Sequence, residues 1–556
     1  MSSNGASAFL AGLVGAEVSH LFTLPGTQTL PLLRLIAEQS TITPVFVRSE
    51  QAAAFGAVGF ARATGRPGVC LSIPGPGATN MVSGVAAAHA DAIPLVAITP
   101  QLDEHMLGRY AVHDCDLLGV FAPIVKAQLV VESAAQLESM IVEASRLARQ
   151  APMGPVHLLY SQSLLNSATG ADAVAAPPTV TEPLPDISVA GAAIAVHLER
   201  AQRPVLYVGS EVSLRGADDL LRTLAERFDA PVFTDEDARG VVSETHPLAL
   251  GTASHDAAVQ AVEQADFCLA VGTRFSEWST KSWSIKLPVE LAHVTESASA
   301  IGRSYPATIS LAAPVDVVLR DLVARTADAH ASRARWWPVA APSSTDSNDS
   351  AGSSAMHPAD VIDALAEVLP PDSLLTLDGS SSAMWMSERY HVRQPSTFLQ
   401  SEVFREIGSA LLMGLGAAVA RPDRQVVVIQ GDGGMLFQLG ELSSVAQAGV
   451  RLILVVFEDG YYNADRLFQE HVYGGRLSDS AVHNPDYVRV ARSFGLRGER
   501  VTTAGQLQAV VRDAYRADAA TLIVVPTIAT AAPARLRERF VEWRRRLGSA
   551  AGSTGE

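Results

Sequence analysis

The chain has 556 residues, a formal net charge of −16, 48% hydrophobic residues and 18% charged residues. This length exceeds what one hydrophobic core serves, so we expect several domains. The excess of acidic residues argues against a nucleic-acid binder, because neutralising phosphates requires a basic surface. Three scattered cysteines, Cys70, Cys115 and Cys268, indicate neither a disulfide framework nor a zinc site.

The start of the chain carries no targeting signal that we recognise. The N-terminus, Met-Ser-Ser-Asn-Gly, has no basic region followed by an apolar stretch, so no signal peptide is predicted. Apolar runs such as Leu452–Phe457 are too short to span a bilayer. We therefore expect a cytoplasmic protein that does not associate with membranes.

Two stretches with the composition of linkers divide the chain. Residues 166–185 are rich in Ala, Pro and Thr, and residues 339–355 are dominated by Ser, Asp and Ala. They predict domains over residues 1–165, 186–328 and 356–530, followed by a C-terminal tail over residues 531–556. Within the tail, residues 533–548 have a helical composition and residues 548–556 are expected to be frayed.

Short apolar, β-branched runs alternate with helical patterns, such as Glu50–Ala63, in each domain. The expected strands are Thr43–Val47, Gly68–Ile73, Pro94–Thr99, Pro204–Val208, Pro231–Thr234, Phe267–Val271, Leu374–Leu377, Gln425–Ile429, Leu452–Phe457 and Thr521–Val525. Continuous apolar runs between helices are typical of parallel strands that are covered on both faces. We therefore predict an α/β protein with three doubly wound parallel-sheet domains.

The clearest chemical pattern lies in the third domain. The strand Gln425–Ile429 leads into Gly431-Asp432-Gly433-Gly434, and the strand Leu452–Phe457 leads into Glu458-Asp459-Gly460. Because parallel strands end at the same edge of a sheet, Asp432 and Asp459 should lie side by side. Two carboxylates beside glycines suit a hard divalent cation such as Mg²⁺, although a Gly-Asp-Gly segment alone is also common in ordinary turns.

This pattern resembles the signature of thiamine-diphosphate enzymes, which usually ends in Asn-Asn where this chain has Glu458-Asp459. The segments Arg48–Ala53 and Gly75–Asn80 resemble the pyrimidine-binding domain of the acetolactate synthase-like group. Further matches are Leu24–Pro31, Ala111–Asp116, Arg203–Gly209, Gly272–Phe275, Asn484–Tyr487 and Leu377–Glu388, and the last of these also resembles benzaldehyde lyase and 2-hydroxyacyl-CoA lyases. The resemblance implies pyrimidine-binding, central and diphosphate-binding domains, in that order.

The resemblance also implies roles for individual residues. The metal ligands would be Asp432, Asp459 and the backbone carbonyl of Tyr461. The residues that would contact the cofactor are Gly26, Glu50, Pro76, Asn80, Ser380, Arg405, Ile407, Gly431, Asp432, Gly433, Gly434, Asp459, Tyr461 and Tyr462. The catalytic candidates are Glu50, Gln28 and His113, and Glu402 is a further candidate for that group.

Glu50 is the residue with the most specific expected role. It ends a strand and opens an Ala-rich helix, where burial would raise the pKa of its carboxyl group. A carboxyl of this kind can share a proton with the pyrimidine ring of the cofactor, although a helix N-terminal Glu is also favoured by the macrodipole alone. By resemblance, the reaction is that of a carboligase or lyase acting on a 2-oxo acid or 2-hydroxy carbonyl compound through an enamine.

Several alternatives remain open. A simple 2-oxo acid decarboxylase uses the same intermediate, and a 2-hydroxyacyl-CoA lyase would use the Arg-rich tail to bind phosphates. Ser49 replaces a usual His, and Glu402–Glu406 replaces a Gly-rich run, so the substrate pocket differs from the usual one. We expect no flavin, since Gly251–Asp256 and His293–Glu296 depart from the flavin-binding pattern. The resemblance implies a homodimer or homotetramer.

Overall fold

The computed structural model describes residues 4–39, 41–169, 185–327, 333–338, 355–475 and 479–552. It contains three six-stranded sheets, and all of the strand pairs recorded in them are parallel. Their strands come from residues 20–161, 204–312 and 374–526, so each sheet falls within one of the expected domains. The prediction of three parallel α/β units is confirmed. Most of both expected linkers lies outside the described residues.

The first sheet has the strand order β2-β1-β3-β4-β6-β5. Its strands are β1 (His20–Thr23), β2 (Thr43–Phe46), β3 (Gly68–Leu71), β4 (Leu95–Gln101), β5 (Ala127–Val131) and β6 (Pro155–Ser161). Its helices are α1 (Gly5–Gly15), α2 (Leu30–Gln39), α3 (Glu50–Thr64), α4 (Pro76–Asn80), α5 (Val82–Ala90), α6 (Leu117–Phe121) and α7 (Leu137–Arg149).

The second sheet has the order β12-β11-β10-β7-β8-β9, in which the chain reverses direction across the sheet between β7 and β10. Its strands are β7 (Pro204–Val208), β8 (Val232–Thr234), β9 (Ala249–Gly251), β10 (Phe267–Val271), β11 (Leu291–Thr295) and β12 (Ile309–Ala312). Its helices are α8 (Ser188–Arg200), α9 (Glu211–Leu214), α10 (Asp218–Phe228), α11 (Asp256–Gln264) and α12 (Val315–Arg325).

The third sheet has the order β14-β13-β15-β16-β18-β17, which repeats the topology of the first sheet. Its strands are β13 (Leu374–Leu377), β14 (Phe398–Gln400), β15 (Val426–Gly431), β16 (Leu452–Glu458), β17 (Arg497–Arg500) and β18 (Thr521–Pro526). Its helices are α13 (Pro358–Val368), α14 (Ser381–Arg389), α15 (Ser409–Ala420), α16 (Asp432–Phe437), α17 (Leu442–Ala448), α18 (Asn463–Val472), α19 (Tyr487–Ser493) and α20 (Ala504–Ala514).

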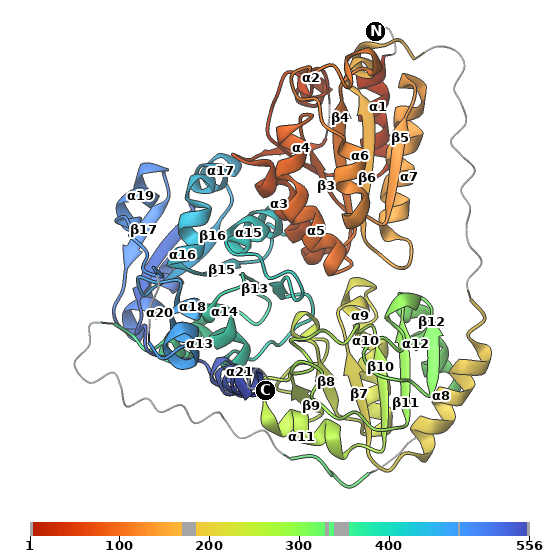
Figure 1. Ribbon diagram of the computed structural model, residues 1–556, viewed down its shortest axis with the longest axis vertical. Coiled ribbons are helices and arrows are strands. Elements are labelled where there is room, and N and C mark those ends of the chain that lie inside the picture. The colour runs from red at the N-terminus through yellow and green to blue at the C-terminus, as the bar shows by residue number, and fades with distance from the viewer. Residues whose placement is uncertain are drawn as a thin grey trace.

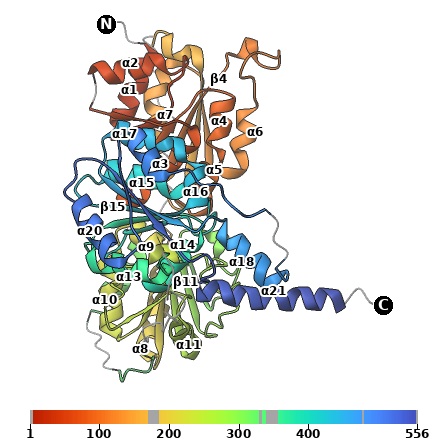
Figure 2. The ribbon, with the colours of Figure 1, turned by 90° about the vertical axis from the view of Figure 1, so that its left-hand side faces the viewer.

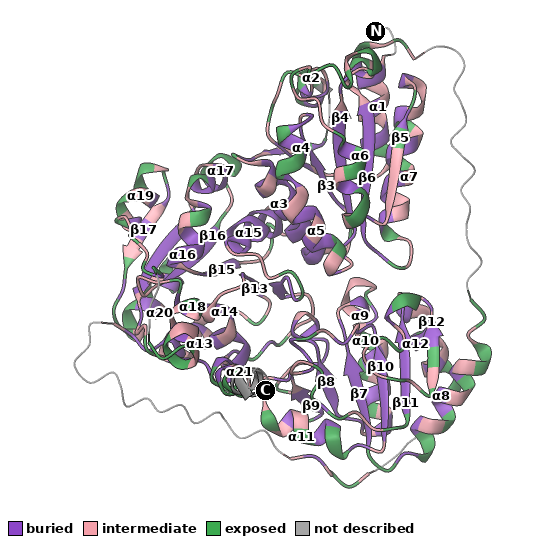
Figure 3. Cartoon of the chain, in the orientation of Figure 1, coloured by how far each residue is buried: buried purple, intermediate pink, exposed green. Residues whose placement is uncertain are grey.

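Alternate residues of the strands feed different hydrophobic cores, which is why the apolar runs are continuous. In β3, Cys70 packs into one core while Val69 and Leu71 pack into the core on the other face. In β15, Val428 shares the core of Cys70, whereas Val427 packs into a separate core. The first and third sheets therefore share one core between them (Figures 1 and 3).

Helices α3 and α15 cross inside this shared core at glycines. A Cβ atom on Gly416 would lie 1.8 Å from the Gly56 carbonyl oxygen, and one on Gly59 would lie 2.1 Å from the Met413 carbonyl oxygen. Neither position tolerates a side chain, so the two backbones are in direct contact. This crossing fixes the start of α3, at Glu50, relative to the segment that precedes α15.

The C-terminal tail forms helix α21 (Ala534–Gly552), which projects from the body of the molecule (Figure 2). The sequence predicts this helix over residues 533–548, with fraying from Gly548 onwards; the helix instead continues to Gly552. The base of α21 packs Leu536 and Phe540 against Leu467 of α18. Within the described residues, no helix combines the length and apolarity needed to cross a membrane.

The helix crossing generates the first prediction. Gly416→Ala should lower the melting temperature by several degrees, because overpacking a core costs about 1–3 kcal/mol and each kcal/mol shifts Tm by about 2–4 °C in domains of this size. Gly505→Ala is the matched control, since Gly505 is also helical but a Cβ there would meet no atom of the described residues within 4 Å. Thermal unfolding followed by circular dichroism gives the comparison. Equal melting temperatures for Gly416→Ala and the wild type would contradict the close crossing.

Candidate functional site

The two expected metal-binding carboxylates meet at the carboxyl edge of the third sheet. Gly431 at the end of β15 pairs with Phe457 of β16, so the residues that follow each strand emerge together. The Asp432 carboxylate accepts hydrogen bonds from the Gly433 N–H at 2.9 Å and from the Gly460 N–H at 2.7 Å. The Gly460 bond ties the first strand end to the second, directly beside Asp459.

The electrostatics of the pair favour a bound cation. Burial, followed by the nearby negative charge of Asp432, raises the pKa of Asp459 to about 7. Burial also raises the pKa of Asp432. A divalent cation between the two carboxylates would remove their repulsion and lower both pKa values.

Asn484 completes this arrangement and was missed as a site residue in the sequence. Its side-chain N–H donates to Asp432 Oδ2 at 2.6 Å, and its Oδ1 accepts from the Tyr487 hydroxyl at 2.9 Å. The Tyr487 hydroxyl also reaches the Asp432 carbonyl oxygen at 3.1 Å. The Asn484–Tyr487 segment was recognised only as a family match, because its spacing from Asp432 gave no sign of contact.

The two adjacent acids Glu458 and Asp459 have different partners. Asp459 Oδ1 accepts from the Tyr461 N–H at 3.0 Å and stays at the site. Glu458 instead pairs with Arg500, with nitrogen–oxygen distances of 2.7 and 2.9 Å. Only the second acid of the pair is therefore placed to bind a metal.

Gly433 and Gly434 form the surface directly after Asp432, called here the floor of the site, and no side chain fits at either position. A Cβ on Gly434 would lie 2.5 Å from Asp378 Oδ2, and one on Gly433 would lie 2.7 Å from the ring of Tyr462. Asp378 Oδ2 accepts from the Gly408 N–H at 3.1 Å, and burial raises the pKa of Asp378 to about 6. Asp378 Oδ1 is buried without a hydrogen-bond partner among the described residues, as are both polar atoms of the Gln430 side chain.

Ser380 and Ile407 lie in the segments that border this floor. Ser380 caps helix α14, accepting from the Ala383 N–H at 3.4 Å, and its hydroxyl lies 2.7 Å from that of Ser382. Ile407 is half-buried and precedes Gly408, which is the N-cap residue of helix α15 and has a φ of +79°. Arg405 has φ +49°, a left-handed conformation that is strained for a residue with a side chain.

Glu50 lies at the carboxyl edge of the first sheet, at the start of α3. It is 5% exposed, and its Oε2 accepts from the Asn80 side-chain N–H at 3.1 Å. A Cβ on Gly77, next to Pro76, would approach Glu50 Oε1 to 2.8 Å and Ile73 to 2.5 Å. The predicted burial of Glu50 is confirmed.

The other first-domain candidates lie on loops around the same edge. A Cβ on Gly26 would lie 2.2 Å from Ile73 and 3.7 Å from Gln28 Oε1. His113 has φ +71°, and its backbone lies against Gly75, where a Cβ would come within 2.8 Å. The loops that carry Gly26, Pro76 and His113 therefore converge towards Glu50, while Gln28 itself is half-buried.

Hydrogen bonds join the carboxyl edge of the first sheet to the third domain of the same chain. Glu441, which follows α16, accepts from the Arg48 N–H and the Ser49 hydroxyl, each at 3.1 Å. Glu406 accepts from the Gln51 side chain at 3.2 Å and from the Ser83 hydroxyl at 2.7 Å. In the described part of the chain, the recorded hydrogen bond of Glu50 itself stays inside the first domain.

Glu402 does not join the other catalytic candidates. Its carboxylate is buried against the central domain, where it accepts from the hydroxyls of Ser276 and Ser279 and from the Asp237 N–H. The segment between β14 and α15 thus contacts two other domains: Glu402 faces the central domain and Glu406 faces the first domain.

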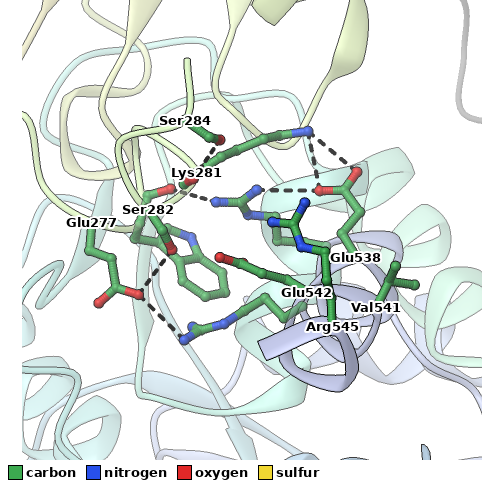
Figure 4. A pocket seen from close by; sticks show the side chains of 11 residues that line it. Glu277, Lys281, Ser282, Ser284, Glu538, Val541, Glu542 and Arg545 are labelled. Carbon is green, nitrogen blue, oxygen red and sulfur yellow. Dashed lines mark hydrogen bonds and ion pairs between the residues drawn. The ribbon is translucent and has the colours of Figure 1, made fainter. Parts of the chain in front are cut away.

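The tail helix docks over Trp278 of the central domain rather than presenting a free row of arginines. The guanidinium groups of Arg405, Arg535 and Arg539 lie 4.0, 5.3 and 5.4 Å from the Trp278 ring. A pocket of about 450 Å³ lies between residues 277–284 and α21. Figure 4 shows Lys281 reaching Glu538 across it. Arg535 also pairs with Glu538 and Arg539 with Glu277, so two of the arginines that a phosphate-binding tail would use are engaged within the protein.

Comparisons with known proteins agree with this geometry. Residues 3–120, 192–322 and 378–525 match the N-terminal TPP binding domain, the central domain and the C-terminal TPP binding domain of thiamine pyrophosphate enzymes. The acetolactate synthase large subunit of Parasynechococcus marenigrum is 32% identical over 94% of this chain and 87% of its own length.

Relatives in other organisms are similar in extent. The acetolactate synthase large subunit of Mycobacterium tuberculosis is 30% identical over 89% of this chain and 83% of its own length. A probable acetolactate synthase large subunit of Methanocaldococcus jannaschii is 29% identical over 92% of this chain and 89% of its own. The chain therefore belongs to the thiamine pyrophosphate enzymes, in the acetolactate synthase-like group of enzymes that form or cleave carbon–carbon bonds.

Proposed function

We propose that this chain is a thiamine-diphosphate- and magnesium-dependent carboligase or lyase that acts on a 2-oxo acid. The observation that carries the proposal is the pair of carboxylates, Asp432 and Asp459, at the glycine-lined edge of the third sheet. The relatives named above are acetolactate synthases, which supports a 2-oxo acid substrate over an acyl-CoA.

The residues at this edge fit a magnesium diphosphate. Mg²⁺ takes oxygen ligands, and it usually keeps one or two carboxylates and receives its other ligands from phosphates and water. Asp432, Asp459 and the Tyr461 carbonyl would supply the protein ligands, with Gly431, Gly433 and Gly434 leaving room beside them. The unpartnered atoms of Gln430 and Asp378, identified among the described residues, are buried polar groups that a ligand would satisfy.

When bound, thiamine diphosphate supplies the carbon nucleophile and the electron sink of the reaction. Glu50 would hold a proton at the pyrimidine ring, and the Asn80 side chain keeps its carboxylate in place. Ile407, stiff at χ1, would pack against the cofactor, and the strained backbone at Arg405 would help to hold the aminopyrimidine through its carbonyl.

The remaining candidates would complete the pocket. Gly26, Pro76 and Asn80 would border the pyrimidine end, and Ser380 and Tyr462 would border the diphosphate end. Gln28 and His113 would be the polar groups nearest the substrate, where an imidazole can exchange protons near neutral pH.

A homodimer or homotetramer is the assembly that we propose. Large apolar side chains around the site are exposed in the single chain: Tyr110, Val112, Val403, Phe404, Phe437 and Tyr462. Exposed apolar surface beside a functional site is typical of an interface. Light scattering of the purified protein should give the mass of two or four chains, and a monomer that remains active on dilution would contradict the proposal.

Proton NMR of the protein with thiamine diphosphate, Mg²⁺ and pyruvate tests the reaction itself. A carboligase consumes pyruvate and yields an acetolactate or an acyloin, with a mixed product when an aldehyde is added. A simple decarboxylase yields free acetaldehyde instead. Unchanged pyruvate, together with unchanged bulkier 2-oxo acids, would reject a 2-oxo acid as the donor.

The role of Glu50 makes the next prediction. Glu50→Gln should lower kcat by roughly 10²–10⁴-fold, the usual contribution of a positioned acid or base, while cofactor affinity changes little. Turnover is measured by pyruvate consumption, and cofactor affinity by isothermal titration. Glu38→Gln is the control, because Glu38 is exposed and pairs with Arg34 on the surface. Wild-type turnover in Glu50→Gln would rule out the assigned role.

The pKa of Asp459 predicts how cofactor binding depends on pH. Below pH of about 7 this carboxyl is protonated, and it must lose its proton before it binds Mg²⁺. The affinity for thiamine diphosphate with Mg²⁺ should therefore be constant at higher pH and fall by up to about tenfold per unit as the pH drops below about 7.

Asp459→Asn should remove most of this pH dependence, because an amide oxygen still binds the metal but does not titrate. Glu458→Gln is the matched control, since the Glu458 carboxylate pairs with Arg500 instead. Isothermal titration at pH 6 and pH 8 compares the three proteins. The same loss of affinity at pH 6 in Asp459→Asn and the wild type would assign the titration to another group.

A further inference from the structure

A second group of carboxylates lies away from the Asp432 edge, between the central and third domains. Asp235, Asp237 and Glu402, called here the acidic trio, each place one carboxylate oxygen within 4.8 Å of the others. Asp235 and Asp237 follow β8 of the central sheet, and Glu402 follows β14 of the third sheet. The side chain of Asp237 is 6% exposed, and Asp235 and Glu402 are each 5% exposed.

The surrounding groups supply oxygen atoms and hydroxyls rather than charge. Glu402 Oε1 accepts from the hydroxyls of Ser276 and Ser279, and its Oε2 accepts from the Asp237 N–H at 3.2 Å. Asp235 Oδ1, by contrast, is fully buried and has no hydrogen-bond partner among the residues that the structure describes. A buried carboxylate oxygen without a donor indicates a missing ligand.

The positive charge available to the trio is small. Its one recorded ion pair, within the described ranges, joins Arg62 Nη1 to Asp237 Oδ2 at 3.8 Å. Arg62 is engaged more closely with Asp91, at 2.6 Å. Arg239 is occupied by Glu244, at 2.7 Å. Arg405 directs its Nε to the Glu402 carbonyl oxygen, at 3.2 Å, rather than to the carboxylate.

Three buried carboxylates with so little compensation require either shared protons or a cation. A proton shared by Asp237 and Glu402 would leave the buried Asp235 Oδ1 without a partner among the described residues, whereas a cation bound to all three carboxylates would serve it as well. The spacing suits a large, hard ion: Ca²⁺ binds oxygens at about 2.3–2.6 Å, so ligands on opposite sides lie up to about 5 Å apart. Serine hydroxyls and carboxylates are both hard oxygen ligands.

We propose that the acidic trio is a Ca²⁺-type cation site that joins the central domain to the third domain, separate from the magnesium site at Asp432. Its ligands are carboxylate oxygens of Asp235, Asp237 and Glu402. The site fastens the segment that leads from β14 to Arg405 and Ile407. This inference does not depend on the reaction proposed above.

Calcium titration of the chelator-treated protein, without thiamine diphosphate, tests the site by isothermal titration. The wild type should bind one Ca²⁺ per chain at the trio. This binding should be retained in Asp432→Asn, a variant that removes the other candidate metal site. Asp235→Asn and Glu402→Gln should each weaken binding by at least about tenfold, since each loses a charged ligand. Glu236→Gln is the matched control, because this buried neighbour lies outside the trio and its Oε1 accepts from the hydroxyls of Thr252 and Ser254.

Terbium luminescence gives a second measurement that needs no change in the trio. Tyr207 bonds to the carbonyl oxygen of Ser279, and Trp278 lines the same pocket as Glu402. Tb³⁺ added to Asp432→Asn should therefore show emission excited through these aromatic residues, and Ca²⁺ should displace it. Absence of saturable Ca²⁺ binding by the wild type would overturn the proposal and leave shared protons as the explanation. Ca²⁺ binding that is unchanged in both Asp235→Asn and Glu402→Gln would overturn it equally.

Discussion

The direct backbone contact between α3 and α15 fixes the relation between the two domains that carry the candidate site. At Gly416 and Gly59 the facing carbonyl oxygens lie where a side chain would begin, so any larger residue would push the helices apart. Because α3 starts at Glu50 and α15 follows Ile407, one crossing sets the positions of both. The hydrophobic core shared by the first and third sheets surrounds this crossing and holds it closed.

Buried carboxylates add specificity to that packing. Glu441 is 3% exposed and accepts from Arg48, Ser49 and Ser444, so its charge is compensated by donors from both domains. Removing water from a carboxylate is costly unless such donors replace it. The apolar contact thus supplies the attraction between the two domains. The hydrogen bonds of Glu441 and Glu406 form in only one relative position of the domains, so they fix that position.

The segment between β14 and α15 is held from three sides. Glu402 reaches the central domain, Glu406 reaches Gln51 and Ser83 of the first domain, and Gly408 bonds to Asp378 of its own domain. This explains how Arg405 is kept at a positive φ that costs energy in isolation. The charged residues that replace a Gly-rich run therefore anchor this segment, and the tail helix reinforces it because Arg405 and Arg535 both contact the Trp278 ring.

Local sequence patterns were sufficient to predict ten of the eighteen strands in the three sheets, and the meeting of Asp432 with Asp459. Continuous apolar runs identify strands buried on both faces, and parallel strands must end at one edge, so both results follow from local spacing. The helix start at Glu50 and its burial were likewise accessible, because an Ala-rich helix that follows a buried strand has to pack closely.

The distant side chains that complete these sites became evident from the three-dimensional arrangement alone. Asn484 reaches Asp432 across 52 residues, and Glu402 meets Asp237 across 165 residues, with nothing in either local pattern to indicate the contact. The fold also separates Glu458 from Asp459, directing one to Arg500 and the other to the site. Periodicity describes how one segment packs, whereas these contacts depend on how three separately folded sheets come together.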